Sequence, residues 1–229
     1  MASNDFRYED EVPENYEQKC PLVLVLDVSG SMYGKPIDEL NKGLKEFKED
    51  IEKDVTSSAR LEVAIVTFGG SVDILQDFAL LDNFTMPTLS INGSTKMVDG
   101  MKKALKILDD RKKWYKNEGQ TYYRPYVVLI TDGYPDRGQD INWLSGEIDR
   151  LYKGKHLNFW AFGVEGADMK LLEQIGHDDS LVQKLKGLEF VKFFRWLSAS
   201  MSVISNSKED DELDIAPKSE KKNPFQIKI

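Results

Sequence analysis

The sequence predicts an α/β domain of the doubly wound, Rossmann-like class, with a mostly parallel central sheet of about six strands and helices on both faces. Short apolar runs of strand length alternate with longer segments whose apolar residues recur at helical spacing. The strand-length runs are almost continuously apolar, which is typical of strands buried on both faces of a parallel sheet. The chain of 229 residues is also long enough for one full-sized domain.

The first half of the chain supplies two buried strands, one edge strand and one helix. LVLVLDVS predicts a central strand at 22–29, and apolar residues three and four apart predict an amphipathic helix at 37–51. ARLEVAIVTFGG predicts a second buried strand at 59–70. The alternating segment VDILQDFAL predicts a half-exposed edge strand at 72–80.

The second half repeats the alternation of helices and strands. The predicted helices lie at 98–117, 141–154, 169–176 and 190–204. The predicted strands lie at 126–133, 157–166 and 181–185.

The two ends of the chain depart from this pattern. Residues 1–19 are rich in acids and read as a loosely attached N-terminal arm, and the domain is expected to span 20–205. Residues 206–229 mix charges with two prolines and are expected to form a tail. The acidic start lacks the basic and apolar stretches of a secretory signal, so a cytoplasmic location is expected.

Composition excludes several function classes. No apolar run reaches the roughly 18–20 residues that cross a bilayer, so no membrane span is expected. A single cysteine, Cys20, cannot form an internal disulfide or a cysteine-based zinc site, and we expect it to be buried. The net charge of −8 argues against a nucleic-acid partner.

Oxygen-bearing side chains lie in loops that should meet at one edge of the sheet, because ligands of open parallel sheets bind off the carboxyl ends of the strands. These loops follow the first strand, precede the helix at 98–117 and end the strand at 126–133. Hard oxygen donors without sulfur or imidazole suit Mg²⁺, with Mn²⁺ as the other candidate ion. The candidate metal ligands are Asp27, Ser29, Ser31, Thr95 and Asp132.

The pattern Asp27-x-Ser29-x-Ser31, with a later loop threonine and a strand-end Asp-Gly, resembles the metal-ion-dependent adhesion site of the von Willebrand factor A family. The predicted order of elements is similar as well. The resemblance implies that Ser29 and Ser31 bind the metal directly and that Thr95 binds it directly or through water. It implies that Asp27 and Asp132 hold the metal, often through waters. It also implies that an Asp or Glu of a partner protein completes the coordination.

Within this family, the sequence is most similar to an intracellular bacterial branch. The similarity lies in the segment DVSGSM, the short length and the closing segment LKGLEFVKFFRWLSASMSVIS. This branch, the TerY-like proteins, is associated with tellurite-resistance and stress operons. The resemblance implies a cytoplasmic protein-interaction module of a stress-response system. It does not cover the arm or the tail.

Each motif also has a purely structural interpretation. The D-x-S-x-S segment could form a turn that caps the following helix. Thr95 could instead cap the helix at 98–117, and Ser94 could take the ligand role of Thr95. Placement after a buried strand, with Thr95 and Asp132 in the expected order, favours the metal site.

The leading functional hypothesis is a non-enzymatic, divalent-metal-dependent protein-binding module. The rival is a Mg²⁺-dependent hydrolase or phosphatase that uses the strand-end Asp27. Phosphatases of the haloacid-dehalogenase type need a second acid two residues later, where this chain has Ser29. Ser29 and Ser31 also lack the G-x-S-x-G frame of serine hydrolases, and no G-x-x-x-x-G-K-[ST] run supports an NTPase.

The predicted helix at 98–117 is rich in cations, which we interpret as a solvated outer face interrupted by Asp109 and Asp110, in preference to a docking patch. These cations are Lys102, Lys103, Lys106, Arg111, Lys112, Lys113 and Lys116. Aromatic residues gather between 114 and 126. They are expected either to form an exposed rim or to pack against the last helix.

Overall fold

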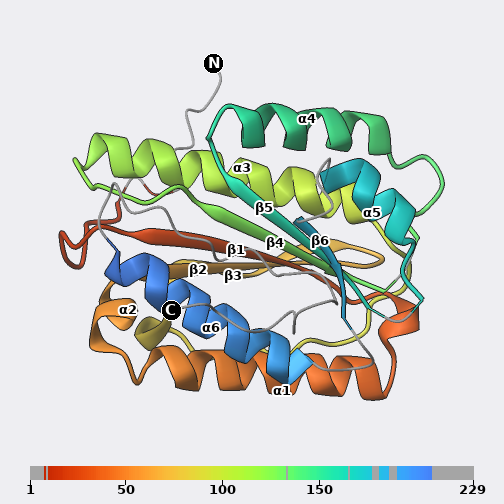
Figure 1. The fold of residues 1–229 in the computed structure, drawn as a ribbon, viewed down its shortest axis with the longest axis horizontal. Helices are drawn as coiled ribbons and strands as arrows, with labels where there is room; N and C mark the ends of the chain where they lie inside the picture. Colours follow the sequence, from red (N-terminus) through yellow and green to blue (C-terminus); the bar gives the residue numbers. More distant parts are fainter. Residues whose placement is uncertain are drawn as a thin grey trace.

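A computed structural model describes residues 8, 10–132, 134–164, 166–176, 181–185 and 190–207. Its centre is a six-stranded sheet with the order β3-β2-β1-β4-β5-β6 (Figure 1). The strands are β1 (Cys20–Asp27), β2 (Leu61–Phe68), β3 (Val72–Leu80), β4 (Tyr126–Thr131), β5 (Asn158–Gly163) and β6 (Val182–Lys184). The helices are α1 (Lys35–Ile51), α2 (Val55–Arg60), α3 (Met97–Asn117), α4 (Ile141–Lys153), α5 (Met169–Gly176) and α6 (Phe190–Asn206). Short 3₁₀ turns are η1 (Gly30–Met32) and η2 (Leu81–Asn83).

The sheet is parallel except at one edge. β1 pairs with β2 and β4, β4 with β5, and β5 with β6, all in parallel. β3 is antiparallel to β2, and the register of this pair shifts on both sides of Ile65. The predicted doubly wound, mostly parallel sheet and its edge strand at 72–80 are therefore confirmed.

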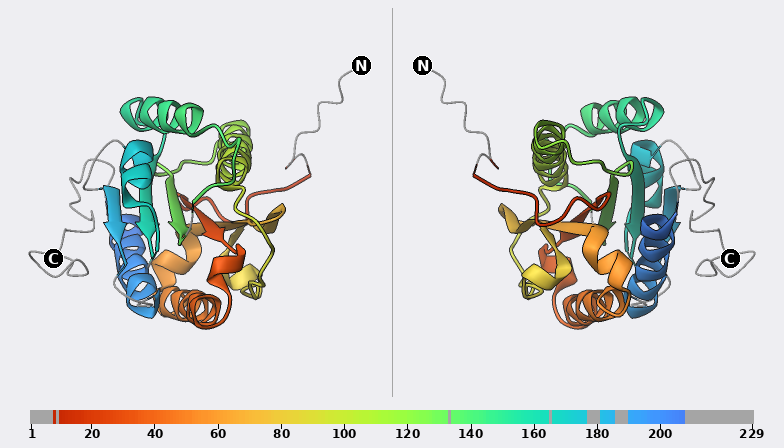
Figure 2. Two further views of the ribbon diagram at one scale, coloured as in Figure 1. Left: turned by 90° about the vertical axis from the view of Figure 1, so that its right-hand side faces the viewer. Right: turned by 90° about the vertical axis from the view of Figure 1, so that its left-hand side faces the viewer.

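The central strands divide the core into two layers. Along β1, Leu22 and Leu24 lie in the layer that α1 and α6 cover, whereas Val23 and Val25 lie in the layer that α3, α4 and α5 cover. The views in Figure 2 show these helices on opposite sides of the sheet. Burial on both faces explains why the strand sequences are continuously apolar.

The predicted helices and strands appear within a few residues of their expected limits, and Cys20 is fully buried as expected. The short helix α2 was not predicted. Its first turn is capped by Asp54, whose carboxylate accepts hydrogen bonds from the backbone N–H groups of Thr56 and Ser57. Within the described residues, no helix combines the length and apolar character that a bilayer span requires.

The described part of the acidic N-terminal segment packs on the domain and is not loosely attached. Tyr8 is buried, and its hydroxyl donates a 2.6 Å hydrogen bond to Asp77 on β3. The indole N–H of Trp114 donates to the carbonyl oxygen of Glu11 at 2.9 Å. The domain limits at 20 and 205 remain predictions, and most of the expected tail lies outside the described residues.

One cation of the basic helix lies in the interior, contrary to the prediction of a solvated face. Arg111 is 2% exposed, and its guanidinium donates two 2.9 Å hydrogen bonds to the carboxylate of Glu62 and one of 2.7 Å to Glu11. The hydroxyl of Tyr115 also donates to Glu62. We call Glu62, Arg111, Tyr115 and Glu11 the closed cluster.

The aromatic residues near this cluster do not form an exposed rim. Trp114 and Tyr115 are buried in the layer of α3, and Tyr122 stacks on Tyr115. Only part of the group reaches the layer of α6: Tyr126 packs against Trp160, which in turn contacts Trp196.

Candidate metal centre

The candidate ligands lie at the carboxyl edge of the sheet, where β1 and β4 run side by side. Asp27 is the last residue of β1, and Asp132 directly follows β4. The helix after β1 packs on one face of the sheet and the helix after β4 on the other. These two strand ends are therefore the point where the winding of the chain reverses, which is the usual place for a ligand in a doubly wound sheet.

Hydrogen bonds join Ser29, Ser31 and Asp132 into a continuous chain. The hydroxyl oxygens of Ser29 and Ser31 lie 3.1 Å apart. The hydroxyl of Ser31 donates to Asp132 Oδ1 at 2.8 Å. Ser29 and Asp132 at its two ends are buried, whereas Ser31 between them is exposed.

Asp27 is fixed at the inner end of the same site. Its Oδ1 accepts a 2.8 Å hydrogen bond from the backbone N–H of Ser29, and its Oδ2 accepts a 2.6 Å bond from the hydroxyl of Thr131. Asp27 is fully buried, whereas Asp132 is 8% exposed. We call Asp27, Ser29, Ser31 and Asp132 the open cluster.

The two carboxyl groups have no cationic partner among the described residues. Burial raises the pKa of Asp27, although hydrogen bonds from Ser29 and Thr131 lower it in part, and the charge of Asp132 raises it further. Burial also raises the pKa of Asp132, against a lowering by the bond from Ser31. Within the described part of the chain, neither carboxylate forms an ion pair with Lys, Arg or His.

The loop of Thr95 is tied to both other loops of the site. The backbone N–H of Gly30 donates to the carbonyl oxygen of Gly93 at 2.7 Å. Thr95 donates its backbone N–H to Asp136 Oδ1 at 3.0 Å, and the backbone N–H of Asp136 donates to the Thr95 carbonyl oxygen at 3.0 Å. Gly93 has a φ of +63°, a conformation that favours glycine. These bonds hold Thr95 at the carboxyl edge with the open cluster.

The helix-capping interpretation of the D-x-S-x-S segment is not supported. Asp27 and Ser29 do form a local turn through the 2.8 Å bond. However, Ser29 is the N-cap of η1 without a side-chain cap bond, and the N-cap of α1 is Gly34. The serine hydroxyls therefore face each other and Asp132 instead of the helix ends.

Thr95 is not the cap of the following helix either. The N-cap of α3 is Lys96, and the free N–H of Val98 donates to Gln139 Oε1 at 2.7 Å. Ser94, the competing candidate, is exposed, whereas Thr95 is 9% exposed.

Sequence reasoning assigned no role to three residues that support the site, which are Thr131, Asp136 and Gln139. Thr131 orients Asp27, Asp136 fixes the Thr95 loop, and Gln139 caps α3. Asp136 and Gln139 act over about 40 positions of sequence, so only their location shortly after a strand end could have indicated a role.

The donor set limits how an ion could be held. Within the described residues, no group of three or more Asp, Glu, His or Cys side chains could hold a metal ion. A cation at the open cluster would therefore depend on hydroxyl groups and water in addition to the two carboxylates. Hard cations such as Mg²⁺ accept such mixed oxygen shells.

Comparison with protein families yields one match. The sequence model of the von Willebrand factor type A domain matches residues 22–190, a range that includes all five candidate ligands. No curated protein sequence matches the chain significantly.

Several solved structures share the fold at low sequence identity. The pilus adhesin SpaC from Lactobacillus rhamnosus GG has a TM-score of 0.65 and 14% identity, over 83% of this chain and 31% of SpaC. The vWF domain of the type V pili tip protein Mfa5 from Porphyromonas gingivalis has a TM-score of 0.61 and 12% identity, over 86% of this chain and 99% of that one. Manganese-loaded Plasmodium vivax TRAP protein has a TM-score of 0.52 and 16% identity, over 77% of this chain and 72% of that one. This chain thus spans about a third of the adhesin, and at these identities the likeness concerns the fold.

Proposed function

This chain belongs to the von Willebrand factor type A domain family, and we propose that it is a non-enzymatic protein-binding module whose interaction depends on a divalent metal ion. In this proposal the ion is Mg²⁺, and a carboxylate of the partner protein completes its coordination. The residues that hold the ion are Asp27, Ser29, Ser31, Thr95 and Asp132.

The observation that supports this proposal best is the pair of carboxylates that have no countercharge in the part of the chain that the structure describes. Asp27 and Asp132 are buried at the end of the sheet, and burial raises the pKa of both. A buried negative charge without a cation is costly. A divalent ion beside Ser31 and Asp132 would remove this cost, and the neighbouring oxygens suit Mg²⁺.

The chain's own residues have distinct roles in this proposal. Thr131 and the backbone of Ser29 hold Asp27 in place from inside the domain. Ser29 and Ser31 offer neutral hydroxyl oxygens, which leave more positive charge on an ion than carboxylates do. When bound, the ion supplies a positive charge that attracts a partner's Asp or Glu.

The identity of the ion can be measured directly. Isothermal titration of the purified chain with Mg²⁺ and with Mn²⁺ should give one binding site for the preferred ion. Asp27→Asn should abolish the heat of binding. Manganese is bound in the TRAP structure that shares this fold, so Mn²⁺ is the natural comparison.

Partner capture tests the metal dependence. The wild-type chain and Ser31→Ala are used as bait in host lysate, in Mg²⁺ and in EDTA, with Asp50→Asn on α1 as a control for an acid outside the site. We expect a protein that is retained by wild type and by Asp50→Asn in Mg²⁺, and is lost in EDTA and with Ser31→Ala. If wild type in EDTA and Ser31→Ala in Mg²⁺ both retain the protein, the interface lies elsewhere on the domain.

The rival hypothesis of a Mg²⁺-dependent hydrolase has its own test. A phosphatase and esterase screen in Mg²⁺ should show no turnover. Turnover that Asp27→Asn abolishes would replace the binding module with an enzyme.

The cellular setting is a finer part of the proposal. We place the chain in the cytoplasm, in a bacterial stress or tellurite-resistance system, because of its resemblance to TerY-like proteins. Two proteins that share its fold are pilus components, SpaC and Mfa5. Fractionation of host cells with an antibody against the chain separates these settings, since a pilus component would be found at the cell surface.

A further inference from the structure

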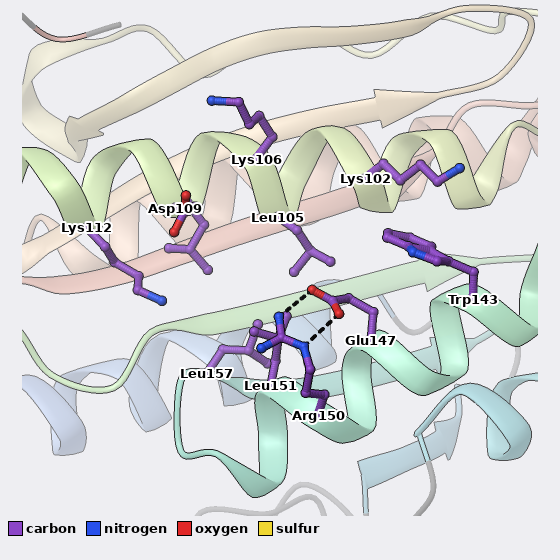
Figure 3. Close-up of a pocket in the computed structure, with 11 residues that line it drawn as sticks. Lys102, Leu105, Lys106, Asp109, Lys112, Trp143, Glu147, Arg150, Leu151 and Leu157 are labelled. Carbon is purple, nitrogen blue, oxygen red and sulfur yellow. Dashed lines mark hydrogen bonds and ion pairs between the residues drawn. The ribbon is translucent and has the colours of Figure 1, made fainter. Parts of the chain in front are cut away.

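A groove of about 460 Å³ lies between α3 and α4, on the outer side of the helical layer (Figure 3). Its apolar lining includes Leu105 and Leu108 from α3 and Leu151 from α4. Trp143, 39% exposed, stands at one end. The groove is separate from the open cluster, and nothing in the proposed function uses it.

The acids that line the groove are already paired. Asp109 forms a 2.7 Å ion pair with Lys113, and Glu147 forms a 2.7 Å ion pair with Arg150. The negative charge of the groove is therefore balanced by cations of the domain.

The lysines that line the groove differ in whether they form ion pairs. Lys106 pairs with Asp110, and Figure 3 shows Lys106 pointing away from α4. Among the described residues, Lys102 and Lys112 have no ion-pair partner. The amine of Lys102 lies 4.9 Å from the ring centroid of Trp143.

Lys112 is half-buried, and burial lowers its pKa. The charge of Arg150 lowers it further, whereas the charge of Asp109 raises it. An anion of a ligand beside Lys112, in addition to Asp109, would compensate for the lost hydration of the Lys112 amine.

The two unpaired lysines mark the two ends of the groove in Figure 3. They are ten positions apart on α3, which corresponds to about 15 Å along a helix axis. A ligand that fits must combine anionic groups at this separation with apolar groups between them. A helix with acids about eleven residues apart, or three turns, meets both conditions on one face.

We propose that the groove between α3 and α4 binds an acidic amphipathic helix of a partner protein. Its apolar side chains cover Leu105 and Leu151, and its two carboxylates pair with Lys102 and Lys112. The leucine-lined floor disfavours nucleic acid, whose backbone offers phosphates without apolar groups between them.

The test uses the full chain and a synthetic helix. The probe is an alanine-rich peptide of about 20 residues, long enough to be helical in water. It carries two Glu about eleven residues apart and Leu on the same face between them, and the control peptide has Gln in place of both Glu. Trp143 reports binding, because the other tryptophans, Trp114, Trp160 and Trp196, are at most 4% exposed. Trp143→Phe confirms the origin of the signal.

We expect the Glu peptide to bind more tightly than the Gln peptide, both in Mg²⁺ and in EDTA. Lys112→Gln should weaken binding about tenfold and Lys102→Gln about threefold, because the half-buried charge is less screened by water. Lys116→Gln and Lys103→Gln, exposed positions on α3 outside the groove, are the matched controls and should leave the affinity unchanged. Melting temperatures check that all variants are folded.

Three outcomes would overturn the proposal. The first is equal affinity for the Glu and Gln peptides, or equal losses in the groove and control variants. The second is binding of phosphatidylserine vesicles without binding of the peptide, which would indicate a lipid surface. The third is self-association that Lys112→Gln abolishes, which would make a second copy of the chain the occupant.

Discussion

The domain carries two groups of buried carboxylates at opposite ends of its sheet. In the closed cluster, Glu62 lies at the start of β2 and receives two hydrogen bonds from Arg111. In the open cluster, Asp27 lies at the end of β1 and receives hydrogen bonds from uncharged groups of Ser29 and Thr131.

The comparison shows that burial of an acid does not by itself identify a binding site. Glu62 is 3% exposed and Asp27 is fully buried, so both have lost their hydration. The difference is the countercharge: Arg111 supplies it to Glu62, whereas no described residue supplies one to Asp27. Breaking a complete cluster destabilises the fold because it leaves a buried charge uncompensated, whereas an incomplete cluster is suited to a cation from solution.

The largest expected effect is in the closed cluster. Arg111→Met leaves Glu62 buried without a cation, so the free energy of unfolding should fall by about 3–5 kcal/mol. Urea denaturation measures this change. Lys113→Met on the same helix removes an exposed lysine that pairs with Asp109 and Asp110, and it should cost far less stability than Arg111→Met because solvent screens these pairs. Equal costs for the two variants would mean that the closed cluster does not stabilise the fold.

In the open cluster, metal binding should increase the stability of the fold. Mg²⁺ at about 100 times its dissociation constant should raise the free energy of unfolding by about 2.7 kcal/mol. Asp132→Asn should lose this increase, yet be at least as stable as wild type without metal, because it removes one of two repelling charges. Thermal melts across a magnesium titration measure both effects. A melting temperature that is constant up to millimolar Mg²⁺ would contradict the metal site.

Substitution of the two serines of the open cluster should have similar effects on Mg²⁺ binding but different effects on stability. Both Ser29→Ala and Ser31→Ala should weaken Mg²⁺ binding. Ser29 is 2% exposed, so its removal should also cost about 1 kcal/mol of stability. Exposed Ser31 should cost less than about 0.5 kcal/mol. Calorimetric titration and denaturation of the same samples give the two quantities, and identical stability losses would argue against the buried position of Ser29.

Glu11→Gln should have the smallest effect. Burial raises the pKa of Glu11 above its usual value, although Arg111 lowers it in part. The folded state therefore favours the protonated carboxyl, and this contribution is lost as the pH rises through the raised pKa. The permanently neutral Gln should change stability at neutral pH by less than about 1 kcal/mol, in the direction of greater stability. The difference from wild type should shrink at acidic pH, and a loss above about 2 kcal/mol would show that the Glu11–Arg111 pair is essential.

The sequence predicted the sheet because each central strand is buried on both faces and is therefore almost entirely apolar, as in β1 and β2. It did not predict α2, because VTSSAR has too few residues to show a helical period and depends on the cap from Asp54. The burial of Arg111 was also not predictable from the sequence. In sequence it is one cation among several, and its burial depends on Glu62, 49 positions earlier.

The site was predictable to the extent that it lies at strand ends. Asp27 and Asp132 follow apolar runs, so the sheet rules place them together. The links that hold Thr95 through Gly93 and Asp136 depend on backbone conformations in long loops, and local sequence patterns do not specify these.

The edge strands at the two borders of the sheet affect whether the chain aggregates while it folds. β3 is an irregular partner of β2, it carries Asp73 and Asp77, and Tyr8 bonds to Asp77 from the N-terminal segment. At the opposite border, β6 spans only three residues in the described part of the chain. In the part of the chain that the structure describes, neither border gives a second molecule a long, regular row of backbone donors and acceptors. The domain should therefore refold at high concentration with little tendency to form fibrils.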